Sequence, residues 1–297
     1  MLENQRTLQG LGFALAGFAL LPVGDAVVKG MAGQWPAPAI GALRYLIGAT
    51  ALVLLLWFRD GRAGFRCPSP WLQLGRAASV SIAATAFFIG VQIMPLADMT
   101  AISFTSPIMV ALMSAIILRE PPPRAVWIAG GIAFVGMIIL LRPNIAAIGW
   151  AGLLPLISAA GFASMVICNR MAAGSGSALQ MQMLISVLAF PMLAVIAFAT
   201  NKTGVPQFAI TWPSGAIVLR CALIACTASL AHTLIFLATE RLSAGRVAPL
   251  VYVQLLMAVT LGAAFFDELP DAGTLAGAVI IIGAGFYLWR SERITAS

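Results

Sequence analysis

The sequence has little charge and an excess of apolar residues. Asp, Glu, Lys and Arg make up 9% of the 297 residues, whereas 61% of the residues are hydrophobic. Soluble domains are about 45–50% apolar and about one quarter charged, so this composition excludes an ordinary water-soluble domain. A lipid bilayer is the solvent that suits such a chain.

The sequence also lacks the residue patterns of common enzymes and metal centres. His232 is the single histidine, and no GxSxG, HExxH or Walker motif is present, so neither a catalytic triad nor a nucleotide-binding loop is indicated. The four cysteines show no metal-ligand spacing and no CxxC pair. We therefore expect no enzyme activity, no cofactor and no metal site.

Long apolar segments make up most of the chain. Ten of them approach the length of about 20 residues that an α-helix needs to cross a bilayer, and they cover residues 8–30, 38–58, 76–94, 98–118, 125–142, 149–170, 178–199, 215–239, 246–266 and 272–290. The segments are too long for barrel strands and do not alternate with a period of two. The sequence therefore predicts an all-α integral membrane protein with ten transmembrane helices.

Basic residues gather on one side of this predicted topology. If the N-terminus is cytoplasmic, twelve of the 17 basic residues fall in inside segments and at most three fall outside. Cytoplasmic segments of membrane proteins carry an excess of Lys and Arg. We therefore expect both termini in the cytoplasm, and we read the net charge of +7 as topological rather than as a sign of a nucleic-acid partner.

One stretch of the sequence occurs twice, at residues 95–136 and again from residue 243 to residue 283. The two copies align Pro95 with Ser243, Phe104 with Tyr252, Ser106 with Gln254 and Glu120 with Glu268. The duplication predicts two five-helix repeats, residues 1–143 and 144–297, and an odd number of helices makes the second repeat inverted. Inverted repeats place a binding site near the midplane where the halves meet.

These residues resemble the drug/metabolite transporter superfamily, of the EamA type, over nearly the whole chain. The resemblance is carried by Asp25, Lys29, Arg44, Tyr45, Pro95 to Asp98, Pro107, Glu120, His232, Ala248, Pro249, Tyr252 to Leu255, Gly262, Glu268 to Asp271 and Gly283 to Tyr287. It implies a multi-pass protein of the bacterial inner membrane that moves a small organic metabolite by alternating access. Without a nucleotide-binding motif, uphill transport would use an ion gradient or exchange.

The PLAD and AISF motifs and the histidine of the eighth segment are most similar to a proteobacterial group that includes riboflavin and S-adenosylmethionine importers. This implies uptake of a vitamin- or nucleoside-like solute. The alternatives are an exporter of amino acids or toxic organic compounds and, from another class, a non-transporting membrane scaffold or channel subunit. The expected partners are a small-molecule substrate and the lipid bilayer; the proton as coupling ion and a homodimer are left open.

Four charged residues of the first half are candidates for binding or coupling, because charges within a bilayer are costly and usually point into the bundle. Asp25 and Lys29 are four residues apart, share a helix face and could pair, although Lys29 could also reach the interface. Arg44 could grip a carboxylate or phosphate, or form a fixed salt bridge with Asp25 or Asp98. Asp98 also suits a helix N-cap.

Three polar residues of the second half complete the candidate set. His232 should lie near the midplane, where it could couple proton movement to the solute or remain neutral and bonded to a neighbouring helix. Tyr252 and Gln254 are two residues apart and do not share a helix face, but Pro249 is expected to bend this helix and expose more of it. The cavity should be lined by helices 1 to 4 and 6 to 9, with helices 5 and 10 peripheral. The glycines at 130, 136, 277 and 283 indicate close helix contacts.

Overall fold

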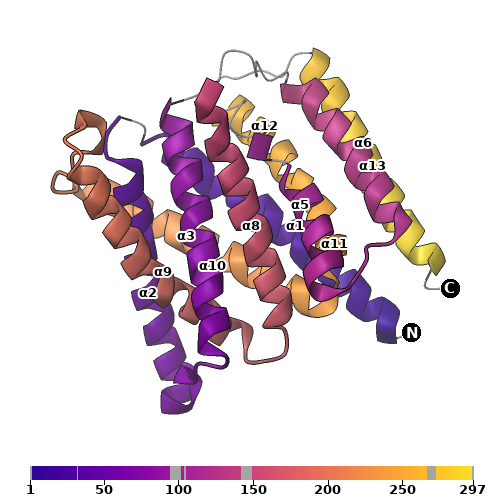
Figure 1. Ribbon diagram of the computed structural model, residues 1–297, viewed down its shortest axis with the longest axis horizontal. Helices are drawn as coiled ribbons and strands as arrows, with labels where there is room; N and C mark the ends of the chain where they lie inside the picture. Colours follow the sequence, from indigo (N-terminus) through magenta and orange to yellow (C-terminus); the bar gives the residue numbers. More distant parts are fainter. Residues whose placement is uncertain are drawn as a thin grey trace.

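The structure, a computed structural model, describes residues 2–31, 33–93, 102–103, 105–141, 149–265 and 272–295. The first half of the chain contains α1 (Leu2–Lys29), α2 (Ala37–Asp60), α3 (Pro70–Ile93), α5 (Ser106–Met113) and α6 (Arg124–Leu141). The second half contains α8 (Leu153–Met171), α9 (Ala178–Asn201), α10 (Gly215–Arg241), α12 (Val253–Phe265) and α13 (Ala272–Thr295). These described ranges contain no strand, and their ten main helices confirm the predicted all-α fold (Figure 1).

Six of the described helices, α1, α2, α3, α8, α9 and α10, are long and apolar enough to cross a membrane. The other four have shorter apolar stretches within the part of the chain that the structure describes. Large apolar side chains are exposed on the outside of the bundle, among them Phe58, Ile116 and Val195. In a bilayer these side chains would contact lipid, whereas in a soluble protein they would be exposed to water.

The observed helices begin and end close to the predicted segments, except that the first and third helices begin six residues earlier; α1 begins at Leu2 rather than at residue 8. The third helix begins at Pro70 rather than at residue 76, because proline is tolerated in the first turn of a helix, where its missing N–H has no intrahelical acceptor to reach. The predicted segment therefore left out the first six residues of this helix, Pro70 to Gly75. The predicted turn at Pro95–Asp98 lies outside the described residues.

The fourth and ninth segments of the prediction are not uniform helices. After α5, the chain forms a π-helical turn at Ser114–Leu118 and then passes through Arg119, whose φ of 56° is left-handed. The ninth segment consists of the short α11 (Ala244–Val247), a 3-10 stretch at Ala248–Tyr252 that includes Pro249, and α12. The proline therefore interrupts the helix where the sequence predicted a bend.

The two halves of the chain are interleaved. Helix α1 packs mainly against α10, and the equivalent helices of the opposite halves, α8 and α3, also form a main contact. Helix α2 packs against its equivalent α9, and α6 against its equivalent α13. Exchanging the halves converts the α1–α10 contact into the α8–α3 contact and leaves the α2–α9 and α6–α13 contacts unchanged, which is the pattern expected for an inverted duplication.

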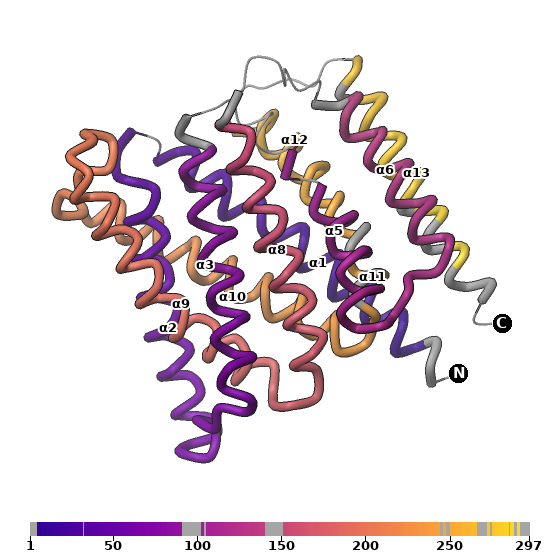
Figure 2. The backbone as a smooth tube through the Cα atoms, in the orientation of Figure 1, coloured from indigo at the N-terminus to yellow at the C-terminus, as the bar shows by residue number. Residues whose placement is uncertain are grey.

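Both chain termini lie at the same end of the bundle, at the lower right of Figures 1 and 2. The segment that joins α2 to α3 and the segment that joins α8 to α9 lie at the same lower end of the view. An even number of spans requires this arrangement. That this end faces the cytoplasm stays a prediction from the basic residues.

Helices α6 and α13 form a pair at one edge of the bundle (Figure 1). A methyl group on Gly136 would lie 3.0 Å from the carbonyl oxygen of Gly277, so the absence of a side chain lets the two backbones approach. A methyl group on Gly130 or Gly283 would meet nothing within 4 Å. The predicted close contact is therefore correct for Gly136 and wrong for Gly130 and Gly283, which lie on other sides of their helices.

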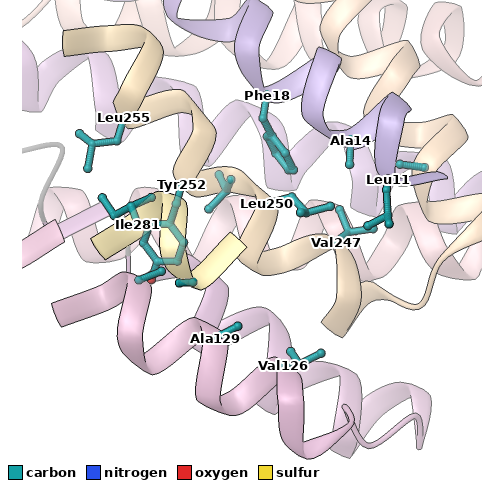
Figure 3. Close-up of a cluster of buried hydrophobic side chains, with 14 of the residues drawn as sticks. Leu11, Ala14, Phe18, Val126, Ala129, Val247, Leu250, Tyr252, Leu255 and Ile281 are labelled. Atoms are coloured by element: carbon teal, nitrogen blue, oxygen red, sulfur yellow. The ribbon is translucent and has the colours of Figure 1, made fainter. Parts of the chain in front are cut away.

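A buried apolar cluster joins this pair to α1, α10 and the interrupted ninth segment. Figure 3 shows Phe18 of α1 on one side of the cluster and the ring of Tyr252 beside Ile281 of α13 on the other. The cluster fixes the 3-10 stretch and therefore the start of α12, on which Gln254 lies.

Candidate functional site

A cavity of about 200 Å³ lies between the two halves of the chain. Residues of α1, α2, α3, α5, α8, α10 and α12 line it, together with Ser103 and Val251. A smaller cavity beside it is lined by α2, α9 and α10. Within the described chain, α6 and α13 contribute to neither cavity. The predicted peripheral position of the fifth and tenth helices is therefore confirmed for the described residues, whereas the seventh helix, α9, was expected to line the main cavity and lines only the smaller one.

Four of the predicted residues meet in the main cavity. Asp25 of α1, Arg44 of α2, His232 of α10 and Gln254 of α12 all line it. They come from both halves and are separated by up to 229 positions in the sequence. Only the folded bundle brings them together.

The other three candidates are placed differently. Lys29 is the last residue of α1 and is partly buried, but it does not line either cavity. Tyr252 is 1% exposed, belongs to the apolar cluster of Figure 3 and does not line either cavity. Asp98 lies outside the described residues.

The guanidinium group of Arg44 is held by aromatic rings rather than by an acid. Its Cζ atom lies 4.8 Å from the centroid of the Tyr45 ring and 5.1 Å from that of Phe88. Such cation–π contacts orient the flat group without neutralising its charge. Its Nε atom is buried and has no hydrogen-bond partner among the described residues.

Asp25 and Arg44 share the cavity but do not form an ion pair. Ion pairs between described side chains include Arg59–Asp60, Arg170–Glu120 and Arg241–Glu240, and no nitrogen of Arg44 lies within 4.0 Å of an Asp25 carboxylate oxygen. The fixed salt bridge between Asp25 and Arg44 that the sequence allowed is therefore absent. The alternative partner, Asp98, is not among the residues that the structure places.

His232 lies beside Arg44 and lines both the main cavity and the smaller one. Its Nδ1 atom is buried and finds no hydrogen-bond partner in the described part of the chain. The smaller cavity also receives Gln182 and Ser186 of α9 and Ser229 of α10. His232 thus stands between the main cavity and a second, polar space.

The opposite end of the bundle is closed by hydrogen bonds between helices. We call this set, Arg76, Glu120, Asn169, Arg170 and Thr239, the bonded end. Arg76 of α3 is 1% exposed, and its Nε donates to Asn169 Oδ1 of α8 at 2.8 Å. Its Nη1 donates to Gln73 Oε1 at 2.6 Å and to the Met181 carbonyl of α9 at 3.2 Å.

Arg170 provides the second half of the bonded end. Its Nη2 lies 3.0 Å from Glu120 Oε1, and its Nε lies 3.3 Å from both carboxylate oxygens. Its Nη1 donates to the Thr239 carbonyl at 3.1 Å. One guanidinium therefore joins the end of α8 to α10 and to the segment that follows the π-helical turn.

Sequence reasoning missed several residues of both regions. It placed Arg76 and Arg170 among the cytoplasmic basic residues and did not foresee their cross-helix partners. It also missed Phe87, Phe88 and Phe162, whose rings line the cavity. One signal was present, because the duplication aligns Ser106 with Gln254, and both residues line the cavity.

The site combines charges of both signs with aromatic and small polar groups. It can hold an organic solute by hydrogen bonds, by ion pairs and by contact with rings. Within the described residues no group of three His, Cys, Asp or Glu side chains could hold a metal ion. The geometry therefore suits solute binding.

Comparison with known proteins identifies the family. Residues 8–142 and 149–290 each match the EamA-like transporter family. A riboflavin transporter of Rhizobium johnstonii is 28% identical over 294 residues, which is 98% of this chain and 94% of that protein. An S-adenosylmethionine uptake transporter of Rickettsia felis is 23% identical over 288 residues, which is 96% of this chain and 94% of that protein.

Two further similarities are informative. The pseudopaline exporter CntI of Pseudomonas aeruginosa is 29% identical over 273 residues, which is 91% of this chain and 92% of that protein. A solved crystal structure aligns with a TM-score of 0.77 over 99% of each chain at 17% identity, a likeness that shows the fold alone. Because the family match covers both halves, this membrane transporter, which is not an enzyme, belongs to the EamA-like transporter family.

Proposed function

We propose that this protein is a secondary active importer of a vitamin- or nucleoside-like solute such as riboflavin or S-adenosylmethionine. The observation that carries the proposal is the cavity between the halves, where Asp25, Arg44, His232 and Gln254 stand beside aromatic rings. The names of the relatives from Rhizobium johnstonii and Rickettsia felis support this class of solute.

Alternating access is the mechanism that the symmetry supports. Most cavity-lining residues lie in the half of the bundle away from the bonded end, such as Asp25 near the end of α1 and Ser106 at the start of α5. The bonded end is closed by Arg76 and Arg170. In an inverted duplication, exchanging the conformations of the two halves would close the open end and open the closed one.

The coupling ion that we propose is the proton, with His232 as its carrier. Histidine is the side chain whose ordinary titration lies near neutral pH. His232 contacts the space that the solute would occupy, and it also contacts the smaller polar cavity. This position would let one side chain respond to both a proton and a solute.

The topology and domain division follow the same proposal. The family matches at residues 8–142 and 149–290 support repeats at residues 1–143 and 144–297. The basic residues support cytoplasmic termini and a place in the bacterial inner membrane. Lys29, Asp98 and Tyr252 stay candidate binding or coupling residues on the strength of the sequence.

An exporter is the second candidate function, and the similarity to the pseudopaline exporter CntI favours it. An alternating-access cavity serves either direction, because the driving gradient decides which way the solute moves. A scaffold or channel subunit is less well supported, since it would not need charges of both signs, without a partner in each other, in a cavity between the halves.

The test is transport by the purified full-length protein in liposomes. Labelled riboflavin and labelled S-adenosylmethionine are offered outside, with and without an inward proton gradient, and empty liposomes serve as the control. We expect the gradient to accumulate one of the two solutes above its outside concentration. Accumulation of neither, or efflux from preloaded liposomes alone under the same gradient, contradicts the proposed import.

A further inference from the structure

We infer that the cavity recognises a zwitterionic solute with a planar ring, so that Arg44 binds a carboxylate, Asp25 binds an ammonium group, and the ring lies against the phenylalanine side chains. This inference rests on the proposed function and narrows its substrate class. It distinguishes between the solutes of the two relatives, because riboflavin is neutral whereas S-adenosylmethionine carries an α-amino acid.

The first support is the separation of two opposite charges in one cavity. Asp25 and Arg44 both line a space of about 200 Å³, yet no ion pair within 4.0 Å joins them. Arg44 is partly buried, and such a charge is costly unless it is paired, whereas Asp25 is exposed and can meet a solute that enters the cavity. A neutral solute would leave both charges unpaired, and a solute of one sign would leave one of them unpaired. A zwitterion would supply a partner for each.

The second support is the orientation of Arg44. The rings of Tyr45 and Phe88 lie at 4.8 Å and 5.1 Å from its guanidinium carbon and restrict where the group can lie. No described acceptor receives a hydrogen bond from it, and Nε is buried without a partner. A guanidinium that is oriented but not satisfied suits a carboxylate, which it can bind with two parallel hydrogen bonds.

The third support is the apolar and hydroxyl lining around the two charges. Phe87 and Phe162 line the cavity from α3 and α8, on opposite halves of the chain. Aromatic side chains prefer stacked or edge-to-face contact with another ring. Ser103 Oγ is buried without a described partner, which leaves a polar atom for a ring nitrogen or hydroxyl. The chemistry is that of an aromatic amino acid or a nucleoside joined to an amino acid.

The comparison with the bonded end supports the same conclusion. Arg170 also lies between helices, but it forms an ion pair with Glu120 at 3.0 Å, and its Nη1 donates to the Thr239 carbonyl. At Arg170, which joins helices, the chain provides an acidic partner within ion-pair distance. At Arg44 it provides an acid in the same space, but not within pairing distance.

The experiment measures binding of four probes to the full-length protein in lipid nanodiscs. S-adenosylhomocysteine is a zwitterion with a purine ring and without a sulfonium charge; two analogues lack either its carboxylate or its α-amine, and riboflavin is the neutral probe. Affinities come from calorimetry, and binding to the folded state is checked by the rise in melting temperature. The variants are Arg44→Gln and Asp25→Asn.

We expect wild-type protein to bind S-adenosylhomocysteine at least about tenfold more tightly than either analogue, a ratio that corresponds to about 1.4 kcal/mol. The preference for the carboxylate should vanish in Arg44→Gln alone, and the preference for the amine in Asp25→Asn alone. Arg59→Gln and Asp60→Asn, in an exposed pair at 3.4 Å, are the matched controls and should leave both preferences unchanged.

The outcomes separate the inference from the proposed function. If riboflavin binds and is taken up while S-adenosylhomocysteine does not bind, import of a vitamin stands and the zwitterion site is wrong. If each variant weakens the preference for the carboxylate and the preference for the amine to the same extent, Arg44 and Asp25 do not bind separate groups of the solute. The inference is then also wrong. If no probe binds and no solute is transported, the proposed substrate class fails together with it.

Discussion

Two interior arginines of this protein have opposite surroundings. Arg76, at the bonded end, is 1% exposed and donates hydrogen bonds to Asn169, Gln73 and the Met181 carbonyl. Arg44, in the cavity, is held between two rings and donates to no described residue. Both residues are equally charged, so the difference lies in what the fold provides around them.

The comparison separates an arginine whose hydrogen bonds join helices from an arginine whose donors have no described acceptor. Hydrogen bonds to a charged group contribute about 1.5–3 kcal/mol, and leaving their buried partners unsatisfied costs stability. Arg76 therefore stabilises the packing of α3, α8 and α9. Arg44 donates no hydrogen bond to a described residue and therefore contributes little of this kind. Substitutions in the two regions should consequently affect different measurements.

The largest expected effect is an all-or-none difference in labelling, which tests which side of the membrane each end of the bundle faces. In a protein with Cys168, Cys221 and Cys226 replaced by alanine, a membrane-impermeant maleimide applied to intact cells should not react with Cys67. The reagent should react fully with a cysteine at Lys202→Cys, because Lys202 follows the end of α9 that is opposite to the predicted cytoplasmic end. Reaction of Cys67 in intact cells would reverse the orientation.

The next largest effect is expected on transport by Arg44→Gln. The variant should reach the membrane at near the normal level, because a lost interhelical hydrogen bond costs only about 0.6 kcal/mol on average in a membrane protein. Its uptake or efflux, normalised to inserted protein, should fall by about tenfold or more, which corresponds to about 1.4 kcal/mol of lost binding. Arg59→Gln is the control. Normal transport by Arg44→Gln would make Arg44 a structural residue.

His232→Ala should also be inserted normally and lose most transport. The residual transport of this variant should no longer depend on a proton gradient between about pH 6 and 8, the range in which an ordinary imidazole titrates. Transport in liposomes at fixed membrane potential measures this dependence. A variant that keeps its proton dependence would remove His232 from the coupling mechanism.

An intermediate effect is expected on stability in Arg76→Ala. The substitution leaves Gln73 and Asn169 without their buried partner, so unfolding should become easier by about 1.5–3 kcal/mol. Thermal unfolding in detergent measures the change, with Arg59→Ala as the exposed control. Arg44→Gln should lower the melting temperature less than Arg76→Ala does. The reverse order would abolish the distinction between the two regions.

The smallest effect is expected at the ion pair of the bonded end. The Glu120 and Arg170 side chains are 35% and 27% exposed, and partly exposed pairs contribute only about 0–1 kcal/mol. Glu120→Gln should therefore raise the rate at which a permeant reagent reaches a cysteine at the buried Thr239 by about two- to fivefold. Asp60→Asn should leave this rate unchanged, and an equal rise in both variants would exclude a role for the pair in closing this end.

The sequence predicted the fold well because its signals are local. Apolar length located the helices to within a few residues, and the duplication at 95–136 and 243–283 predicted two inverted repeats. Intramembrane polarity was enough to find Asp25, Arg44, His232 and Gln254. Such a residue is rare in an apolar segment, so its rarity alone singles it out.

The rest depended on which helix faces meet, and no local signal records that. Tyr252 and Gln254 are two residues apart, and only the 3-10 stretch at Ala248–Tyr252 decides that the first joins the apolar cluster while the second lines the cavity. The phenylalanines of the cavity look like any other apolar residue in the sequence. Arg76 looked like a cytoplasmic charge because its partners, Asn169 and the Met181 carbonyl, are about a hundred positions away.

Interleaved halves also set the order in which the protein can be completed in the membrane. Helix α1 is synthesised first but finds its main partner, α10, only when most of the chain has been made, and α6 has to wait for α13. During synthesis, Asp25 and Arg44 face an unfinished bundle. Each half expressed by itself should therefore be degraded, whereas the two halves produced together as separate chains should rescue one another.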